Sequence, residues 1–137
     1  MKQKFTAKKD KFWIYIFISL LFPIYIYSLD EIDVDQMYYL IPAFLPFIIF
    51  IWAYFSTVYY LDAQYFYYKS AFLKGRIEIE KIKEIEQNKT LWSGVKPALA
   101  AKGLIIKYGY DEIYVAPLSN EQLTQALLKI NSNIIVK

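Results

Sequence analysis

Two long apolar segments near the start of the chain constrain its fold more than any other feature. The first, residues 12–29, reads FWIYIFISLLFPIYIYSL and carries no formal charge. The second, residues 36–61, is also free of charge, and its densest part reads YYLIPAFLPFIIFIWAYF. A bilayer core of about 30 Å is spanned by roughly 20 apolar helical residues. The sequence therefore predicts transmembrane helices over residues 12–29 and 36–56.

A buried helical hairpin in a soluble protein and a cleaved signal peptide are the alternatives. Two helices that are apolar on every face need more covering chain than the rest of a 137-residue protein supplies. The stretch Tyr27-Ser28-Leu29 lacks the small-x-small pattern of a cleavage site, and a second apolar segment follows it. A two-helix membrane hairpin is the better interpretation.

A short acidic turn, residues 30–35, separates the two segments. Asp33 and Asp35 are spaced as in some cation-binding loops. The glycine and the glutamate that an EF-hand loop needs at fixed later positions are missing. We therefore predict no metal site, and expect the acids to keep the turn in water; they are Asp30, Glu31, Asp33 and Asp35.

Lysine residues flank the hairpin on one side only. Residues 1–11 carry five lysines and one aspartate, whereas the turn contains neither Lys nor Arg. Positively charged flanks stay in the cytoplasm. We expect a multi-pass protein of the cell inner (cytoplasmic) membrane with both termini cytoplasmic. Residues 1–11 would then form a basic cytoplasmic N-terminus, and residues 57–137 a cytoplasmic domain.

The interior of the two apolar segments predicts an anchor. It contains no Asp, Glu, Lys, Arg or His, one of which a transporter or proton pump normally carries within the bilayer. The hairpin is therefore interpreted as an anchor or a partner-binding surface. Pro23, Pro42 and Pro46 lie toward its outer half and predict kinks there, which leaves open either plain packing or a ligand cleft.

The first part of the following domain predicts strands. TVYYL (57–61) and QYFYYKS (64–70) are rich in aromatic residues and predict a β-hairpin. GRIEIEKIKEIEQ (75–87) fits two strands with a turn near Lys81, and a short helix from Glu80 is the alternative for its second half.

The second part predicts a strand pair and a helix. GLIIKYG and EIYVA are joined by a short turn and end at Pro117. Ser119 and Gln122 have the spacing of a helix N-terminal capping box. The predicted fold class is an α+β membrane protein, with a transmembrane hairpin followed by a small PH-like β barrel or sandwich capped by a C-terminal α-helix.

Several short patterns of this domain resemble a known family. The chain from about Val58 to Asn131 resembles the bacterial PH-like family that includes the sublancin immunity protein, whose members join such a domain to membrane helices. The resemblance implies a membrane-anchored PH-like protein and an immunity role. It is carried by Ile77, Ile79, Ile82 and Ile85 after Gly75, by Pro97-Ala98, by residues 104–109 and by Val115-Ala116-Pro117.

The residue types present argue against an enzyme. The chain has no His and no Cys, so the usual general base, thiol nucleophile and zinc ligands are missing. Phosphate-binding glycine motifs are absent as well. The glutamates of residues 78–86 alternate with isoleucines, as on the solvated face of a strand. We predict a non-enzymatic protein without cofactor.

One basic cluster is the candidate binding site. KSAFLKGR places Lys69, Lys74 and Arg76 in a turn between two predicted strands. The cluster is similar to the pattern by which some eukaryotic PH domains hold phosphoinositide headgroups, and three converging cations could hold a phosphate. The alternative is that they are exposed charges attracted by anionic lipid. Nucleic acid is not an expected partner, because the net charge of +3 is small.

Two functions follow from this interpretation. The chain could confer immunity by binding a toxin or shielding its membrane target, or it could be a structural or regulatory subunit of a larger membrane complex. Both give it the lipid bilayer and a protein as partners, and a homo-oligomer is left open.

Overall fold

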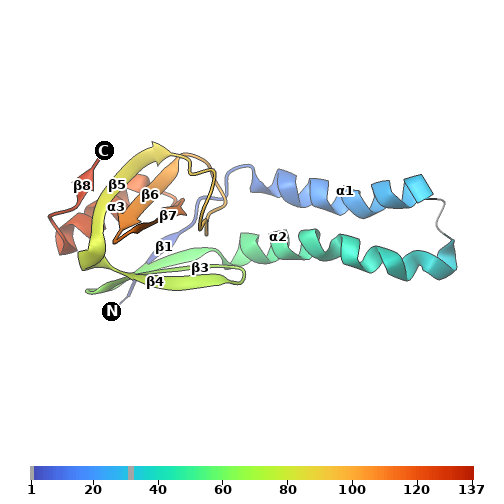
Figure 1. Cartoon of the computed structure of the whole chain (residues 1–137), viewed down its shortest axis with the longest axis horizontal. Coiled ribbons are helices and arrows are strands. Elements are labelled where there is room, and N and C mark those ends of the chain that lie inside the picture. Colours follow the sequence, from blue (N-terminus) through green and yellow to red (C-terminus); the bar gives the residue numbers. More distant parts are fainter. Residues whose placement is uncertain (1, 31–32) are drawn as a thin grey trace.

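The chain forms a helical hairpin that projects from a small β-sandwich. The computed structural model describes residues 2–30 and 33–137 (Figure 1). Helix α1 spans Phe12–Asp30, and the returning arm consists of the 3-10 helix η1, Val34–Phe44, and helix α2, Leu45–Ser56. Both predicted apolar segments are therefore helical. Glu31, in the predicted acidic turn, lies outside the described residues, while Asp33 and Asp35 are exposed.

Two prolines lie where the returning arm changes from a 3-10 helix to an α-helix. Pro42 lies within η1, and Pro46 stands at the start of α2. Proline has no backbone N–H to donate, so α-helical hydrogen bonding is interrupted at both positions. The Leu45 N–H instead bonds to the Pro42 carbonyl, which is the three-residue spacing of a 3-10 turn. The expected single α-helix over 36–56 thus begins as a 3-10 helix.

The first sheet contains four antiparallel strands in the order β1-β2-β3-β4. They are β1 (Gln3–Thr6), β2 (Val58–Leu61), β3 (Tyr65–Ser70) and β4 (Leu73–Glu78). Strands β2 and β3 are the predicted aromatic hairpin. Asp62 closes the turn between them, because its carboxylate accepts hydrogen bonds from the Gln64 and Tyr65 N–H groups at 2.8 and 2.7 Å.

The second sheet has the order β7-β6-β5-β8. Its strands are β5 (Ile82–Lys89), β6 (Gly103–Tyr108), β7 (Asp111–Val115) and β8 (Ile135–Val136). Strand β8 runs parallel to β5, and the other neighbours are antiparallel. The 3-10 turn η2 (Ile79–Lys81) connects β4 to β5, so the two-strand prediction for residues 75–87 is confirmed.

A C-terminal helix completes the domain, as predicted. Helix α3 spans Asn120–Ile130, and the Ser119 hydroxyl caps it by accepting a hydrogen bond from the Gln122 N–H at 3.3 Å. Leu123 and Leu127 on its inner face are fully buried. The core between the sheets and this helix is aliphatic and aromatic, and it includes Phe5, Tyr59, Phe66, Ile77, Ile79, Ile85, Leu104, Ile106 and Ile113.

Strand β1 shows that the hairpin is an insertion into the sandwich. Residues 1–11 were predicted to be a basic terminus, but Gln3–Thr6 pair with β2, from which they are separated by both hairpin arms. The Lys8 N–H also donates to the Ala116 carbonyl, and the Leu118 N–H to the Thr6 carbonyl, each at 2.8 Å. A domain boundary at residue 57 alone therefore omits one strand of the sandwich.

Polar contacts fix the hairpin to the first sheet. The Thr57 hydroxyl donates to the Ala53 carbonyl at 2.6 Å and is 2.7 Å from the Ser70 hydroxyl. The Ser56 hydroxyl accepts the N–H of Ala71, in the β3–β4 turn, at 2.7 Å. Because these groups are largely buried, the end of α2 and the turn form one unit. Strands β2–β4 continue the direction of α2 (Figure 1).

Candidate functional site

The candidate site is the outer side of the first sheet. Side chains alternate between faces along each strand, and Phe5, Tyr59 and Phe66 point into the core. Their neighbours therefore point outward. We call this surface the basic face; it carries Lys2, Lys4, Lys69, Lys74 and Arg76 together with Tyr60, Tyr65 and Tyr67.

Strand register arranges the basic face in rows. One row crosses the whole sheet as Lys4, Tyr60, Tyr67 and Arg76, since each residue is the cross-strand partner of the next. The neighbouring row, nearer the hairpin, is Thr6, Val58, Lys69 and Lys74. Rows on one face are about 7 Å apart along the strands, so a ligand would meet a broad surface and not a single point.

The predicted site residues share this face, but they do not lie in a turn. Ser70 ends β3 and Leu73 begins β4, so the turn itself contains only Ala71 and Phe72. Lys69 and Lys74 are cross-strand partners, and Arg76 lies within β4. All three side chains are exposed. This open geometry does not favour the phosphate clamp.

Aromatic rings hold two of the cations. The Arg76 guanidinium carbon is 4.7 Å from the centre of the Tyr65 ring, and the Lys2 Nζ is 3.9 Å from the centre of the Tyr67 ring. A cation over an aromatic face is stabilised by the ring quadrupole. The tyrosines therefore orient charges on the sheet without neutralising them.

The acids on and beside the basic face already have partners. Glu78 is 3.1 Å from Lys81 in an ion pair. The backbone N–H groups of Gln64 and Tyr65 lower the pKa of Asp62, and a hydrogen bond to Asp62 raises the pKa of Tyr67. Within residues 2–30 and 33–137, none of the five cations of the basic face forms an ion pair. Their charge is therefore open to an acidic ligand.

Placing Lys69 opposite Lys74 has a cost. Like charges directly across two strands destabilise a sheet. The arrangement therefore does not serve the stability of the first sheet, and binding of an acidic group would relieve the repulsion. This is the electrostatic argument for a binding surface.

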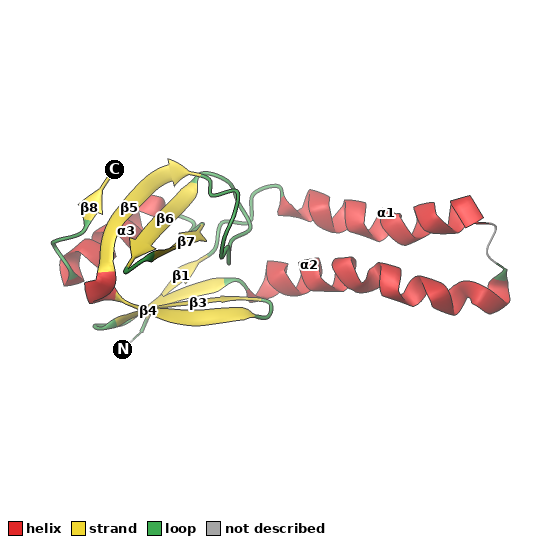
Figure 2. Cartoon of the chain, viewed as in Figure 1, coloured by secondary structure: helices red, strands yellow, loops and turns green. Residues whose placement is uncertain are grey.

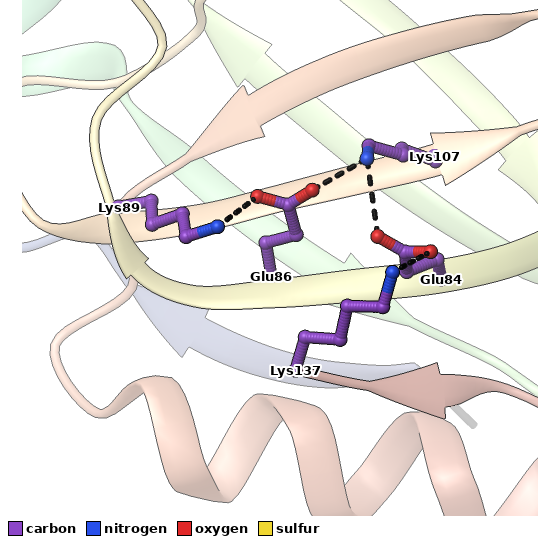
Figure 3. A network of polar contacts seen from close by, with 5 residues as sticks. All are labelled: Glu84, Glu86, Lys89, Lys107 and Lys137. Atoms are coloured by element: carbon purple, nitrogen blue, oxygen red, sulfur yellow. Dashed lines mark hydrogen bonds and ion pairs between the residues drawn. The ribbon is translucent and has the colours of Figure 1, made fainter.

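Three lysines on or beside the second sheet are neutralised within the fold. Lys107 on β6 bonds to Glu84 at 3.0 Å and to Glu86, both on β5 (Figure 3). Lys89 and Lys137 bond to Glu86 and Glu84 at 2.8 and 3.1 Å. Lys107 and Lys89 hold the pKa of Glu86 at about 2, and Lys107 and Lys137 lower that of Glu84.

This network corrects one prediction. Glu84 and Glu86 were expected on a solvated strand face, but their side chains are only 17% and 14% exposed. No group of three or more His, Cys, Asp or Glu residues that could hold a metal occurs in the described chain.

Sequence reasoning missed Lys2 and Lys4 as members of the site. Their only signal was the alternation KQKFT at residues 2–6, which places both lysines on one side of a short strand and Phe5 on the other. Five lysines before an apolar segment instead suggested a topology signal. The tyrosines were predicted as strand residues but not as part of a binding face.

Comparison with known proteins places the domain in a family. The model of the family described as "Bacterial PH domain" matches residues 57–131. The uncharacterized protein YyaB of Bacillus subtilis (strain 168) is 30% identical over 88 residues, which cover 63% of this chain and 60% of that protein. The chain thus matches less than two thirds of this relative's length.

The comparisons are not more specific than this. No solved structure matches the chain. The narrower resemblance to the sublancin immunity protein stays a prediction. The family match covers more than half of the chain and coincides with the sandwich from Thr57 through α3. The chain belongs to the bacterial PH domain family.

Proposed function

We propose that this protein is a non-enzymatic, membrane-anchored binding protein whose hairpin spans the bilayer and whose PH-like domain presents the basic face to an acidic protein partner. The observation that carries the proposal is the insertion of the hairpin between β1 and β2, two paired strands of that face. The anchor and the binding surface are therefore parts of one structural unit.

Exposure of the hairpin supports membrane insertion. Segments 12–29 and 34–56 are long and apolar enough to cross a bilayer, and only 11% of each is buried within the protein. Large apolar side chains such as Phe17, Ile24 and Ile41 are exposed along both arms. An apolar surface of this extent on a soluble monomer would be an aggregation liability, whereas lipid covers it without cost.

The pairing of β1 with β2 supports placing both ends of the hairpin on the same side of the membrane. Residues 3–6 precede the first arm and residues 58–61 follow the second, yet they form one sheet. Both segments must therefore lie on one side of the membrane, and a hairpin that crosses the bilayer twice returns the chain to that side. The lysines of residues 1–11 and the positive-inside rule then favour the cytoplasm, which gives an inner-membrane protein with both termini cytoplasmic.

The direction of the sheet favours a protein over lipid as the ligand of the basic face. Strands β2–β4 continue along the axis of α2, so the face extends away from a membrane crossed by the hairpin (Figure 1). Only the row with Lys69 and Lys74 lies at the hairpin end. Arg76 lies one row further from the hairpin, and Lys2 lies two rows further. The attraction of anionic lipid weakens over a Debye length of about 8–10 Å, so it acts less on these two cations. The partner is either a toxin or a subunit of a membrane complex.

Site-specific photo-crosslinking tests the proposal. We would replace Tyr60, in the centre of the basic face, with p-benzoylphenylalanine in the full chain and irradiate native membranes. We expect a discrete crosslinked protein that disappears when Lys69→Glu and Lys74→Glu are added. The matched control carries the same probe at Tyr110, which is fully exposed in the β6–β7 turn. Equal crosslinking from both positions, or no effect of the two charge reversals, would contradict the proposal.

A further inference from the structure

We propose that the junction between the hairpin and the sandwich binds one anionic phospholipid, with its phosphate near Lys11 and Lys96 and one acyl chain between the two hairpin arms. The inference rests on the membrane anchoring proposed above. It concerns a different surface from the basic face. The residues involved come from the chain that enters α1, from α1 and α2, and from the loop between β5 and β6.

The charged half of this site is a cavity of about 520 Å³ beside the start of α1. Loop 90–102 forms its other wall, and Figure 2 shows this loop next to the chain that enters α1. Lys11 and Lys96 line the cavity together with Asp10 and Trp92. Two cations face one acid, so the lining carries a net positive charge.

Lys96 is held in position by aromatic rings. Its Nζ is 5.6 Å from the centre of the Trp92 ring and 5.4 Å from that of Tyr114. Neither Lys96 nor Lys11 forms an ion pair with any residue that the structure describes. Both ammonium groups therefore remain available to a phosphate. Trp92 itself is 88% exposed, which suits a residue at a membrane interface.

The apolar half is a groove of about 500 Å³ between the two arms. Ile18, Leu21 and Phe22 of α1 line one side, and Pro46 and Phe50 of α2 line the other. Ser19, Tyr25 and Tyr15 complete the lining. The hydroxyl of Ser19 donates to the Ile16 carbonyl at 2.7 Å, so it adds no free donor to the groove.

The two halves adjoin each other. Tyr15 and Phe50 line both the charged cavity and the apolar groove. Each half has the size of an ordinary small-molecule site, about 300–1,000 Å³. A ligand that fills both must have an anionic head and a long apolar tail, and its head must lie where the hairpin enters the domain. An anionic phospholipid in the cytoplasmic leaflet has this shape and this charge.

Native mass spectrometry of the full chain in detergent tests the inference. Phosphatidylglycerol and phosphatidylcholine with identical acyl chains are added separately. We expect one phosphatidylglycerol per chain to survive at collision energies that remove phosphatidylcholine. Lys96→Gln should reduce the phosphatidylglycerol-bound fraction about fivefold, the effect of losing one lysine–lipid interaction. Ile18→Trp, which fills the groove, should reduce it as well, and inorganic phosphate should not displace the lipid.

The matched control is Lys83→Gln. Lys83 does not line either half of the proposed site. Its Nζ bonds to the Gly109 carbonyl at 3.0 Å, so Lys83→Gln removes the same charge as Lys96→Gln and a contact that lies outside the site. Equal retention of the two lipids, equal effects of Lys83→Gln and Lys96→Gln, or displacement by phosphate would overturn the inference. Membrane fractionation of the same variants separates the two proposals. A chain absent from the membrane fraction would contradict the anchoring, whereas a membrane-bound chain without lipid preference would contradict only this inference.

Discussion

The two sheets of the sandwich use lysine in opposite ways. On the second sheet, Lys107 lies between Glu84 and Glu86, so its charge is satisfied inside the fold. On the first sheet, Lys69 faces Lys74 across two strands. The comparison teaches that net charge and composition do not identify a binding surface. What distinguishes the two faces is whether the protein itself supplies the counter-charge.

The largest expected effect tests whether the first sheet depends on β1. Phe5 is 7% exposed and packs into the common core, so Phe5→Ala should lower the free energy of unfolding by about 3–5 kcal/mol. Thermal unfolding of the purified full chain would measure this. Lys4→Ala, the neighbouring change on the outer face, should stay within about 0.5 kcal/mol. Similar losses for the two variants would mean that β1 is not part of the core.

A second prediction concerns the link between the sheets. The Tyr59 hydroxyl on β2 donates to the Pro97 carbonyl at 2.6 Å and accepts the Ala116 N–H at 3.1 Å. Tyr59→Phe leaves both buried groups without this partner, so it should cost about 1–3 kcal/mol. The same change at exposed Tyr110 is the control in the same thermal unfolding assay. If Tyr59→Phe is neutral, the sheets are joined by apolar packing alone.

The smallest predicted effect is acid sensitivity of the second sheet. Lys107 lowers the pKa of both Glu84 and Glu86, so their ion pairs stabilise the fold above the unfolded glutamate pKa of about 4.5. That stability is lost as pH falls toward the folded pKa of Glu86, about 2. Lys107→Met should flatten the decline of melting temperature between these pH values, because it raises both glutamate pKa values.

Lys74→Met is the control for this pH series. It removes a lysine from the first sheet, where no ion pair with a described residue is lost. The decline of melting temperature with acid should therefore match that of the unmodified chain. A flattening as large as that of Lys107→Met would show that the two sheets do not differ in how they use lysine. Asp62 also has a lowered pKa, but neither variant removes the backbone N–H groups that cause it.

Most of the fold could be predicted because its signals are local. Strands β2 and β3 are rich in aromatic residues, and Ser119 marks the start of α3 in the sequence. Strand β1 could not be predicted in the same way. Its four residues become a strand only by pairing with β2 across the whole hairpin, and no local pattern of that length identifies such a distant partner.

The basic cluster was placed in a turn for a similar reason. Gly75 looks like a turn residue in the sequence, but it lies inside β4, where the end of the Tyr68 side chain occupies the space beside it. The turn instead uses Ala71 in a left-handed conformation, with φ of 49°, and the Ser56 hydroxyl accepts its N–H. That contact comes from α2, so the position of the turn depends on tertiary structure.

Single-cysteine labelling on intact cells tests the central claim most directly, since the chain contains no native cysteine. Asp33→Cys should react with a membrane-impermeant thiol reagent. Lys4→Cys and Asn133→Cys should react only after permeabilisation, because β1 and the rest of the sandwich lie on one side of the bilayer. Reversed labelling would contradict the cytoplasmic orientation. Labelling that places Lys4→Cys and Asn133→Cys on opposite sides would contradict the pairing of β1 with β2, and with it the basic face.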